Sequence, residues 1–444
     1  MKKYEKYKDS GVPWIGEIPK DWKVEKLKRV LIIQKDISVK ENPVVLSLAR
    51  DGVKVRDISS NEGQIAATYE NYNAVKRGDL LLNPMDLISG ANCSYSYVYG
   101  VISPAYFNLR AHKGYHTKYY DYFFKVQYWT LALFAHGKGV SKENRWTLNS
   151  ETLKQYYVLT SNHSEQKKIT DYLDDNMVLI DKLISDKQDL IIRLREYCQT
   201  IINETVTKGL DKKALMKDSG IDWIGEIPEG WSLKKFKYLF TFNRGLNITK
   251  ADLIEVGIPC VNYGEIHSKF GFEINPEFNI LKFVDKNYIE SFPTALLRRG
   301  DFIFADTSED IEGSGNFTCL NSDIPTFAGY HTIVTRQKEN HSYRYLSYLF
   351  ESIKYRNQIR CSVYGVKLFS ITQNILKNTL VLLPSKKEQE QISCFLDKKR
   401  NEINSTVNRI EQQITKLQEY KKSIISEAVT GKIKIEKYIN EGVI

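Results

Sequence analysis

Two histidines four residues apart, His112 and His116 in the stretch HKGYH, could bind a metal ion if they met on one helix face. No glutamate adjoins them and no third ligand is evident, so we favour two surface histidines. The cysteines give no metal pattern either, because no two of them form a C-x-x-C pair. The six are Cys93, Cys198, Cys260, Cys319, Cys361 and Cys394. We therefore expect no metal site, no disulfide framework, and reduced thiols that are mostly buried.

Motifs for nucleotide hydrolysis and methyl transfer are also missing. The sequence contains no G-x-x-x-x-G-K-[ST] phosphate loop. The glycine-rich stretch GSGNF at Gly313 lies among acidic residues, which oppose phosphate binding. Asn83-Pro84-Met85-Asp86 is similar to the Asn-Pro-Pro-Tyr motif of DNA amino-methyltransferases, but Asp86 cannot stack on a base as the aromatic residue of that motif does. The sequence therefore predicts no catalytic residue in this chain.

The chain contains an internal sequence repeat. KDSGVPWIGEIPKDW starts at Lys8 and KDSGIDWIGEIPEGW starts at Lys217, an offset of 209 with 11 identical positions. A second pair of segments starts with Glu-Gln at 165 and at 388, an offset of 223. Both of these carry Leu-Asp at the same place and close with Val-Thr. The chain is thus a tandem duplication of a box, a variable stretch and a long segment.

Each long segment has the apolar spacing of a helix with a heptad seam. Steps of three and four residues separate its apolar residues, and Lys187 fills one place in the pattern. Gly209 and Gly431 stand where helix C-caps are expected. An apolar stripe on so long a helix needs a partner, so we expect the two helices to pair antiparallel, against the alternative that each packs on its own domain. The predicted seam is Ile169, Leu173, Ile180, Ile184, Ile191, Leu194, Ile392, Leu396, Ile403, Val407, Ile410, Ile414 and Leu417.

The stretches between boxes and helices contain short strand-like runs such as GDLLLNP and GDFIFAD. Each predicts a mixed α/β domain, and the whole chain is predicted to be α+β, with two pseudo-symmetric domains and two long antiparallel helices. The expected boundaries are a first domain at 1–160, a helix at 164–210, a second domain at 211–385, a helix at 387–433 and a tail at 434–444.

The positive charge lies outside the helices. The chain of 444 residues has a net charge of +10. Residues 165–210 carry 7 basic and 9 acidic residues, and residues 388–433 carry 8 and 7, so the rest of the chain has a net charge of +11. We therefore expect the two variable domains to bind a polyanion.

The repeated frame resembles the specificity subunit of Type I restriction–modification systems. The resemblance is carried by DSGVPWIGEIPKDWKVEKLK and DSGIDWIGEIPEGWSLKKFK, then by EQKKITDYLD and EQEQISCFLD. The proline typical before the Glu-Gln helix is present in LVLLPSKKEQ and absent from LTSNHSEQ. The resemblance implies two target-recognition domains that each read half of a bipartite site in double-stranded DNA, and helices that set the spacing and dock modification subunits.

The resemblance also implies which chemistry belongs to other chains. S-adenosylmethionine is expected on the modification (methyltransferase) subunits, and ATP and Mg on the restriction (translocase and nuclease) subunits, with no cofactor in this chain. Two other function classes stay open: a scaffold without DNA specificity, and a self-contained methyltransferase or nuclease. The charged N-terminus and the lack of a long apolar run favour a cytoplasmic protein without a membrane segment.

Candidate DNA contacts are polar or basic residues in expected loops. The segment GKGVSKENRWT and its counterpart CSVYGVKLFS, each before a long helix, supply most of them. The candidates are Asn92, Lys138, Ser141, Lys142, Asn144, Arg145, Ser314, Asn316, Tyr364 and Lys367. For the tryptophans of the boxes, Trp14, Trp22, Trp223 and Trp231, we expect a structural role that ties each domain to the end of a helix.

Overall fold

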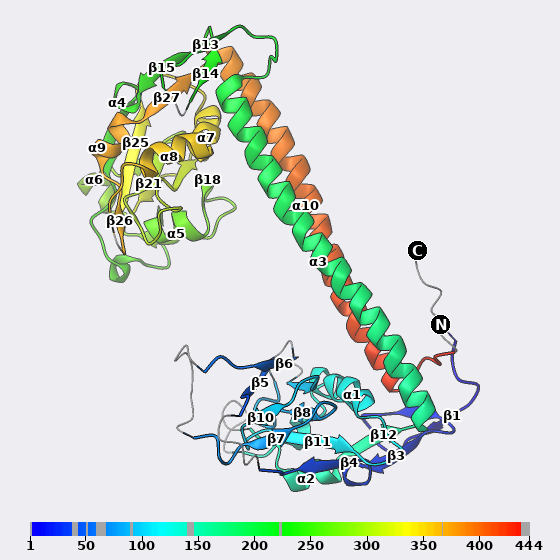
Figure 1. Cartoon of the computed structure of the whole chain (residues 1–444). Helices are drawn as coiled ribbons and strands as arrows, with labels where there is room; N and C mark the ends of the chain where they lie inside the picture. The colour runs from blue at the N-terminus through cyan, green and yellow to red at the C-terminus, as the bar shows by residue number, and fades with distance from the viewer. Residues whose placement is uncertain are drawn as a thin grey trace. The chain divides into compact units, whose positions relative to one another are not determined.

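The computed structural model describes residues 2–37, 43–49, 52–58, 68–88, 92–139, 146–221, 224–365 and 367–436. The chain forms two compact units, one of residues 1–187 and 411–444 and the other of residues 188–410. Helices α3 (His163–Lys208) and α10 (Lys386–Val429) each contribute to both units (Figure 1). The predicted α+β class, with mixed domains and two long helices, is confirmed.

The first unit is built on an antiparallel sheet with the strand order β4-β11-β8-β9. Helix α1 (Thr117–Trp129) packs on this sheet, and its Phe123 and Phe124 are fully buried. The sheet strands are β4 (Leu31–Gln34), β8 (Leu80–Leu82), β9 (Cys93–Tyr95) and β11 (Phe107–Ala111). The remaining elements are the pairs β1 (Tyr7–Asp9) with β2 (Glu17–Pro19), β3 (Lys23–Lys26) with β12 (Tyr157–Thr160), β5 (Leu46–Ala49) with β6 (Gly52–Val55), β7 (Asn73–Val75) with β10 (Gly100–Ile102), the 3-10 turns η1 (Leu27–Arg29) and η2 (Phe134–His136), and α2 (Ser150–Gln155).

The second unit has a five-stranded sheet with the order β16-β25-β21-β23-β18 and a four-stranded sheet with the order β19-β17-β24-β20. The first sheet is made of β16 (Phe240–Arg244), β18 (Phe272–Ile274), β21 (Phe302–Ala305), β23 (Phe317–Leu320) and β25 (Thr332–Gln337). The second is made of β17 (Ile258–Val261), β19 (Lys282–Val284), β20 (Leu296–Leu297) and β24 (Thr326–Ala328). Three further pairs are β13 (Met216–Asp218) with β14 (Glu226–Pro228), β15 (Ser232–Lys235) with β27 (Leu380–Leu383), and β22 (Thr307–Ser308) with β26 (Phe369–Ser370). The helices are α4 (Phe236–Leu239), η3 (Lys250–Asp252), α5 (Tyr263–Ser268), α6 (Tyr288–Ser291), α7 (Tyr343–Glu351), α8 (Ile353–Arg360) and α9 (Gln373–Asn378).

The two domains have an equivalent aspartate–arginine pair in their sheets, although few residues are identical between their sequences. In the first unit, buried Asp79 accepts hydrogen bonds from Arg110 at 2.7 and 2.9 Å. In the second unit, buried Asp301 accepts from Arg336 at 2.7 and 3.0 Å. Each aspartate follows a glycine at the start of a buried strand, and each arginine lies on the strand paired with it. The weakly matching stretches VKRGDLLLN and LRRGDFIFA therefore occupy the same place in the two domains.

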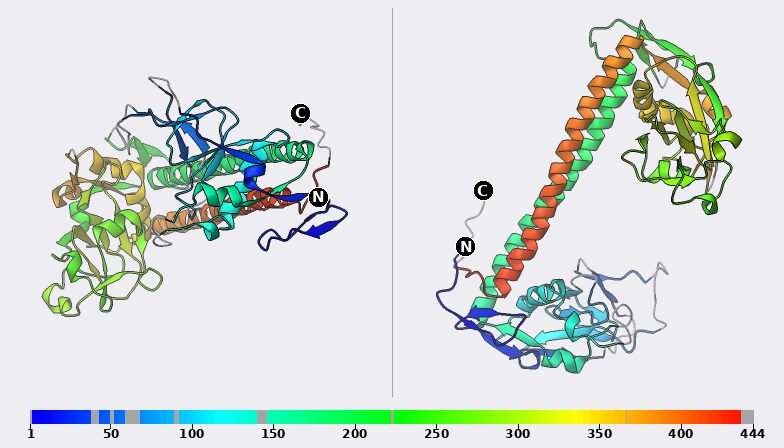
Figure 2. Two further views of the ribbon diagram at one scale, coloured as in Figure 1. Left: turned by 90° about the horizontal axis from the view of Figure 1, so that it is seen from below. Right: turned by 180° about the vertical axis from the view of Figure 1, so that it is seen from behind.

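Within each unit the long helices run antiparallel (Figures 1 and 2). In the first unit, Lys421 Nζ lies 2.5 Å from Asp181 Oδ1, and Lys187 Nζ donates to Gln413 Oε1 at 2.7 Å. In the second unit, residues late in α3 pack with residues early in α10; these are Ile202 and Val206 with Ile392 and Leu396. Partners descend along one helix as they ascend along the other, which is the antiparallel pairing expected from the sequence.

The predicted seam residues lie on the covered side of both helices. Nine of them are buried: Ile169, Leu173, Ile180, Ile191, Ile392, Leu396, Ile403, Val407 and Ile410. Ile184, Leu194, Ile414 and Leu417 are half-buried. Gly209 and Gly431 follow the helices with φ of 75° and 73°, as expected of C-caps. Over the described ranges no helix is long and apolar enough to cross a bilayer.

Candidate nucleic-acid interface

The repeated box is fixed to a long helix by its last tryptophan. In the first unit, the indole Nε1 of Trp22 donates to Glu165 Oε2 at 3.2 Å, and the hydroxyl of Tyr4 donates to Glu165 Oε1 at 2.6 Å. Burial raises the pKa of Tyr4, and the hydrogen bond to Glu165 raises it further. In the second unit, Trp231 Nε1 donates to Glu388 Oε2 at 3.0 Å. The glutamate of each Glu-Gln pair thus holds the box that precedes its own domain.

The glutamine of each pair holds the domain instead. Buried Gln166 accepts a hydrogen bond at 2.8 Å from the backbone N–H of His116, which precedes α1. Buried Gln389 accepts at 3.0 Å from the backbone N–H of Ser342, which precedes α7. These backbone groups lie at helix N-termini, where N–H groups lack partners within the helix. The repeated Glu-Gln therefore joins box, domain and long helix at one point.

The repeated Leu-Asp extends this attachment along the helix. Asp174 accepts hydrogen bonds from Lys118 at 2.5 Å and from the hydroxyl of Tyr122 at 2.7 Å. Asp397 accepts from Arg344 at 2.7 Å and from the hydroxyl of Tyr348 at 2.6 Å. The donors stand four residues apart on α1 and on α7, so the two attachments have the same geometry.

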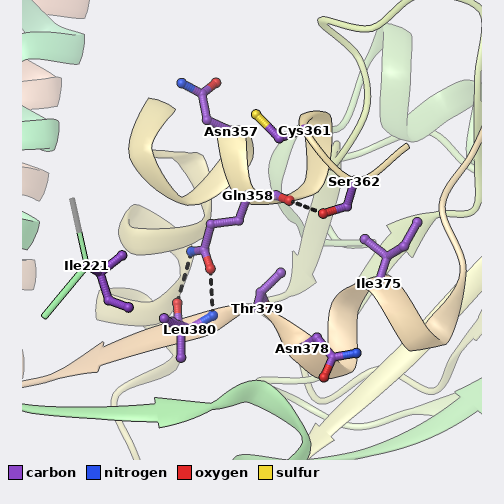
Figure 3. Close-up of a pocket in the computed structure, with 9 residues that line it drawn as sticks. All are labelled: Ile221, Asn357, Gln358, Cys361, Ser362, Ile375, Asn378, Thr379 and Leu380. Carbon is purple, nitrogen blue, oxygen red and sulfur yellow. Dashed lines mark hydrogen bonds between the residues drawn. The ribbon is translucent and has the colours of Figure 1, made fainter. Parts of the chain in front are cut away.

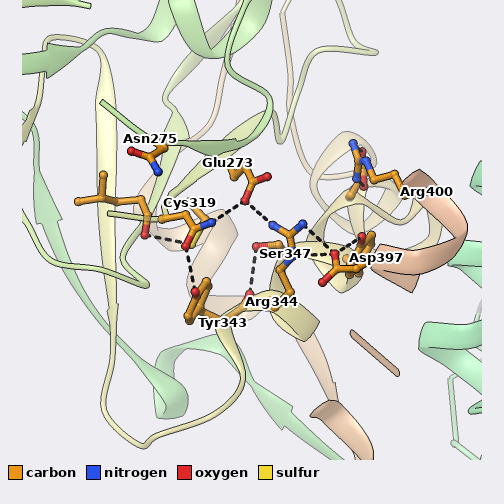
Figure 4. Close-up of polar contacts among 12 residues, drawn as sticks. Glu273, Asn275, Cys319, Tyr343, Arg344, Ser347, Asp397 and Arg400 are labelled. Atoms are coloured by element: carbon orange, nitrogen blue, oxygen red, sulfur yellow. Dashed lines mark hydrogen bonds and ion pairs between the residues drawn. The ribbon is translucent and has the colours of Figure 1, made fainter. Parts of the chain in front are cut away.

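A wider ionic network surrounds the second attachment (Figure 4). Arg344 also pairs with Glu273 of β18, so one guanidinium joins the sheet to α10. Arg400 of α10 pairs with Glu351 at 2.7 Å and stacks on the ring of Phe272 at 4.0 Å. Each of these charges has an opposite charge beside it, so the network fixes the domain on its helices and leaves no charge free for a ligand.

The tryptophans of the boxes differ in their surroundings. Trp22 and Trp231 are buried, as a structural role requires. Trp14 is 42% exposed and contacts the ring of His136 at 5.1 Å. Trp223 lies outside the described residues. The structural role stays a proposal for the tryptophans of the boxes, and the burial of Trp22 and Trp231 supports it.

A polar cleft of about 930 Å³ lies at one end of the five-stranded sheet. Strands β16 and β21 end there and the antiparallel β25 between them begins there, because Arg244 pairs with Ile333 and Ala305 pairs with Thr332. The segment from β26 into α9 also lines it. We call this the edge cleft; its lining consists of Arg244–Ile248, Asp306–Thr307, Tyr330–Ile333, Ser370–Asn374 and Lys377.

A second hollow of about 760 Å³ shares Thr307, His331 and Ser370 with the edge cleft. Its lining includes the acidic residues Glu309, Asp310 and Glu312, so we call it the acidic hollow. His331 stands between the two with its side chain 58% exposed and with φ of 55°. Acidic side chains repel a phosphate backbone, so the edge cleft suits nucleic acid better than the acidic hollow does.

A third hollow, of about 480 Å³, lies elsewhere in the second unit (Figure 3). The amide of Gln358 occupies it, donating to Leu380 O at 3.1 Å and accepting from Leu380 N at 2.6 Å. Its described lining carries no charged residue, and Ile221 and Ile375 make much of it apolar. Such a surface offers nothing to a polyanion.

Three residues predicted to contact DNA have their side chains turned to internal partners. Ser314 is fully buried with its hydroxyl 3.5 Å from Asp310 O, and Asn92 is buried and donates to Asp86 O at 3.1 Å. Asn316 accepts from Arg356 at 2.7 Å and donates to His267 Nδ1 at 2.8 Å. Burial or hydrogen bonding therefore occupies polar atoms of all three, and their contact with DNA stays a proposal that this arrangement does not support.

Tyr364, Lys367 and Lys138 remain available for DNA. Tyr364 is 87% exposed and Lys367 is exposed, on the loop that leads to Ser370 of the edge cleft. Lys138 is exposed, and its backbone pairs with Thr147. Ser141, Lys142, Asn144 and Arg145 lie outside the described residues.

Sequence reasoning missed the residues that make the edge cleft polar: Arg244, Asn247, Gln373 and Lys377. A signal for two of them was present, because Lys35 lies 209 residues before Arg244 and Lys154 lies 223 residues before Lys377. These are the offsets of the two repeats. Among the described residues, no cluster of three or more His, Cys, Asp or Glu side chains is placed to hold a metal.

Comparison with known proteins gives a consistent family. Residues 228–416 match the family model described as Type I restriction modification DNA specificity domain. The chain is 26% identical over 280 residues to the Type I restriction enzyme MjaVIII specificity subunit of Methanocaldococcus jannaschii, covering 61% of each chain. It is 25% identical over 211 residues to the putative type I restriction enzyme MjaX specificity subunit of the same organism, covering 47% of each. The matches thus span less than two thirds of either relative.

Two solved structures share the fold. One, from work on the "structural basis underlying complex assembly and conformational transition of the type I R-M system", has a TM-score of 0.70 at 14% identity and covers 94% of this chain and 99% of that one. The other, the HsdS subunit from Thermoanaerobacter tengcongensis, has a TM-score of 0.53 at 14% identity and covers 94% and 98%. At such identities the likeness concerns the fold alone.

Proposed function

We propose that this chain, which belongs to the specificity subunits of Type I restriction–modification systems, selects the bipartite DNA site on which such a complex acts. In this proposal each of the two domains reads one half of the site. The observation that carries it is the doubled attachment, in which a glutamate, a glutamine and an aspartate fix each domain to a long helix in the same way. A chain built to read two half-sites needs two such mounted domains.

The charge distribution and the missing chemistry support the same role. The net charge of +11 outside the helices favours DNA as the partner. The sequence contains no phosphate loop and no aromatic residue at the end of its Asn-Pro motif, so methyl transfer and ATP hydrolysis are assigned to partner subunits. Methyl transfer by the purified chain without partners would contradict this assignment.

An exchange of domains tests the proposal. Residues 23–160 begin with β3 and end with β12, which pair with each other, so the exchanged segment keeps both strands of one ladder. Replacing it with the corresponding segment of another specificity subunit should change one half of the methylated site and leave the other half unchanged. Methylated sites mapped across a genome provide the measurement. A change in both halves would contradict the assignment of one half-site to each domain.

The helices are proposed to dock the modification subunits. Val178, Leu179 and Leu183 of α3 are 68%, 54% and 48% exposed, although apolar surface of this kind is normally covered. The positions 223 residues later in α10 are Asn401, Glu402 and Thr406, which are polar. Leu183→Glu should therefore weaken binding of modification subunits, measured by co-purification, more than the matched Thr406→Glu does. Equal effects of the two substitutions would show that the exposed apolar residues of α3 do not bind the modification subunits.

The paired helices are also proposed to set the spacing of the half-sites. A heptad inserted into α3 together with a matching heptad in α10 lengthens the helices by about 10 Å, or about three base pairs. The gap in the methylated site should widen accordingly while both half-sites stay the same. An unchanged gap would show that the helices do not determine it.

A further inference from the structure

We propose that the edge cleft reads the bases of the half-site assigned to the second domain. Asn247 and Gln373 are the base-reading residues, and Arg244 and Lys377 hold the neighbouring phosphates. This inference rests on the proposed function, because it names the residues by which one recognition domain would choose its sequence. It is carried by four observations: the construction of the cleft, the availability of its amides, its charge, and the pattern of its residues across the two repeats.

The cleft is built by a close approach of backbone segments. A Cβ at Gly245 would lie 2.0 Å from Gly329 O and 2.1 Å from the Thr332 hydroxyl. A Cβ at Gly329 would lie 1.9 Å from Asn262 Oδ1. Only glycine fits at both places, so the chain leaving β16 is packed against the turn before β25. Arg244 and Asn247 come from the end of β16 and the chain that follows it, and Gln373 and Lys377 come from α9; all four line the same cleft.

The two amides are available to a ligand. Asn247 is exposed and Gln373 is half-exposed, and neither side chain hydrogen-bonds within the described part of the chain. Some other amides of the second unit are used internally: Asn279 Oδ1 accepts from Asn275 N, and Gln389 Oε1 accepts from Ser342 N. A free carboxamide carries a donor and an acceptor side by side, which match the N6 and N7 positions of adenine in the major groove. The half-site read here is therefore expected to contain an adenine.

The charge in the cleft fits the same ligand. Arg244 is exposed, and Lys377 lies with its ammonium 5.1 Å from the centre of the Phe242 ring, with no acidic partner among the described residues. The acidic residue of the lining is Asp306, whose carboxylate accepts from Thr307 at 2.8 Å and lies 3.2 Å from His331 Nδ1. The cations therefore remain free to meet phosphates, while the carboxylate is occupied on the side of the acidic hollow.

The proposed phosphate contacts are repeated in the two domains, whereas the proposed base contacts are not. Lys35 and Lys154 stand in the first domain where Arg244 and Lys377 stand in the second, at offsets of 209 and 223. Two structural observations support these alignments. Strand β4 pairs with β11 in the same register in which β16 pairs with β25. Leu153 of α2 and Leu376 of α9 are both buried.

The amides do not repeat. Ser38 and Ser150 are the counterparts of Asn247 and Gln373 at the same two offsets. Positive charge is thus common to both domains and the amides belong to one. This is the pattern expected if phosphate contacts position every recognition domain and base contacts distinguish one domain from the other.

The experiment uses the full chain assembled with its modification subunits. Asn247→Ala and Gln373→Ala are each expected to relax the methylated site at one position of one half. Discrimination at that position should fall by about 5- to 150-fold, with the other half unchanged. Asn357→Ala is the matched control, because Asn357 is an exposed amide that lines the hollow of Figure 3 and not the edge cleft.

The cations have a different expected signature. Arg244→Ala and Lys377→Ala should weaken binding to all duplexes alike and lower the slope of log K against log salt by about one each. Lys286→Ala, an exposed lysine outside both hollows, is the control and should leave the slope unchanged. Arg244 is exposed, so Arg244→Ala should not change thermal unfolding; Lys377 is half-buried over the Phe242 ring, so thermal unfolding of both variants is measured beside binding.

Two failures can be told apart. If the unmodified complex methylates no bipartite site, the proposed function fails. If it does so and both amide variants keep the full site while both cation variants keep the salt slope, the edge cleft is not the reading surface. Relaxation of the half-site read by the first domain would likewise overturn the inference.

Discussion

The bond between Trp231 and Glu388 allows a quantitative test of how the box is attached. Trp231→Phe keeps an aromatic ring in place and removes the indole N–H that donates to Glu388 at 3.0 Å. A hydrogen bond to a charged group contributes about 1.5–3 kcal/mol, and the lost ring atoms add about 1 kcal/mol. The free energy of unfolding should therefore fall by about 2.5–4 kcal/mol.

The other copy of the box supplies a matched comparison. Trp22 donates to Glu165 over a longer distance of 3.2 Å, and Tyr4 donates to the same carboxylate at 2.6 Å. Glu165 therefore keeps a strong partner in Trp22→Phe, whereas Glu388 loses its only side-chain partner among the described residues in Trp231→Phe. We expect Trp22→Phe to cost about 1–2 kcal/mol less than Trp231→Phe, since the ring loss is the same.

The assay is denaturant unfolding of the full chain, followed by mapping of the methylated site with the assembled complex. Both variants should lose stability and retain the site of the unmodified protein, because the tryptophans lie at the helices and not in the edge cleft. Equal losses in the two variants would refute the argument from the shared carboxylate. A changed methylated site in a variant that still assembles would refute the structural role itself.

Three more outcomes follow from contacts in the two units. Arg336→Ala leaves the carboxylate of buried Asp301 without its cation, and denaturant unfolding should show a loss of about 3–5 kcal/mol. Burial, and then the nearby His163, lowers the pKa of His116 below its ordinary 6.5, so the folded protein binds fewer protons than the unfolded chain and stability should fall as pH drops below 6.5. His116→Gln should remove part of that fall in pH-dependent unfolding curves. Gly245→Ala should lower stability by about 1–3 kcal/mol and weaken DNA binding, because the new methyl group meets backbone at 2.0 Å.

The long helices and the repeated box could be predicted from the sequence because each has a local sequence pattern. A heptad seam, a glycine at a helix end and a repeated box each need only a few neighbouring residues to be recognised. The two helices accordingly occupy 163–208 and 386–429, close to the expected 164–210 and 387–433. The chain even repeats the contacts of its frame, since Glu165 and Glu388 both accept from a tryptophan of the preceding box.

The edge cleft could not be predicted in the same way. Its walls come from segments near 244, 306, 330 and 370, and only the pairing of β16, β25 and β21 brings them to one end of a sheet. Polar type alone was also a poor guide to exposure. Ser314 and Asn316 look like loop residues in the sequence, yet the first is buried and the second bridges Arg356 and His267.

The attachment residues are repeated in both halves of the chain and the amides of the edge cleft are not, and this difference has a physical reason. A residue that joins a domain to a helix must satisfy a fixed partner, so Gln166 and Gln389 meet the same kind of backbone N–H in both halves. A residue that reads a base has its partner on another molecule, and nothing within the chain constrains its type. The two domains can therefore share the glutamate, glutamine and aspartate attachments and still differ at Asn247 and its counterpart Ser38. Duplicating the attachments while varying the proposed reading residues lets one chain hold two unlike domains, as the proposed recognition of an asymmetric bipartite site requires.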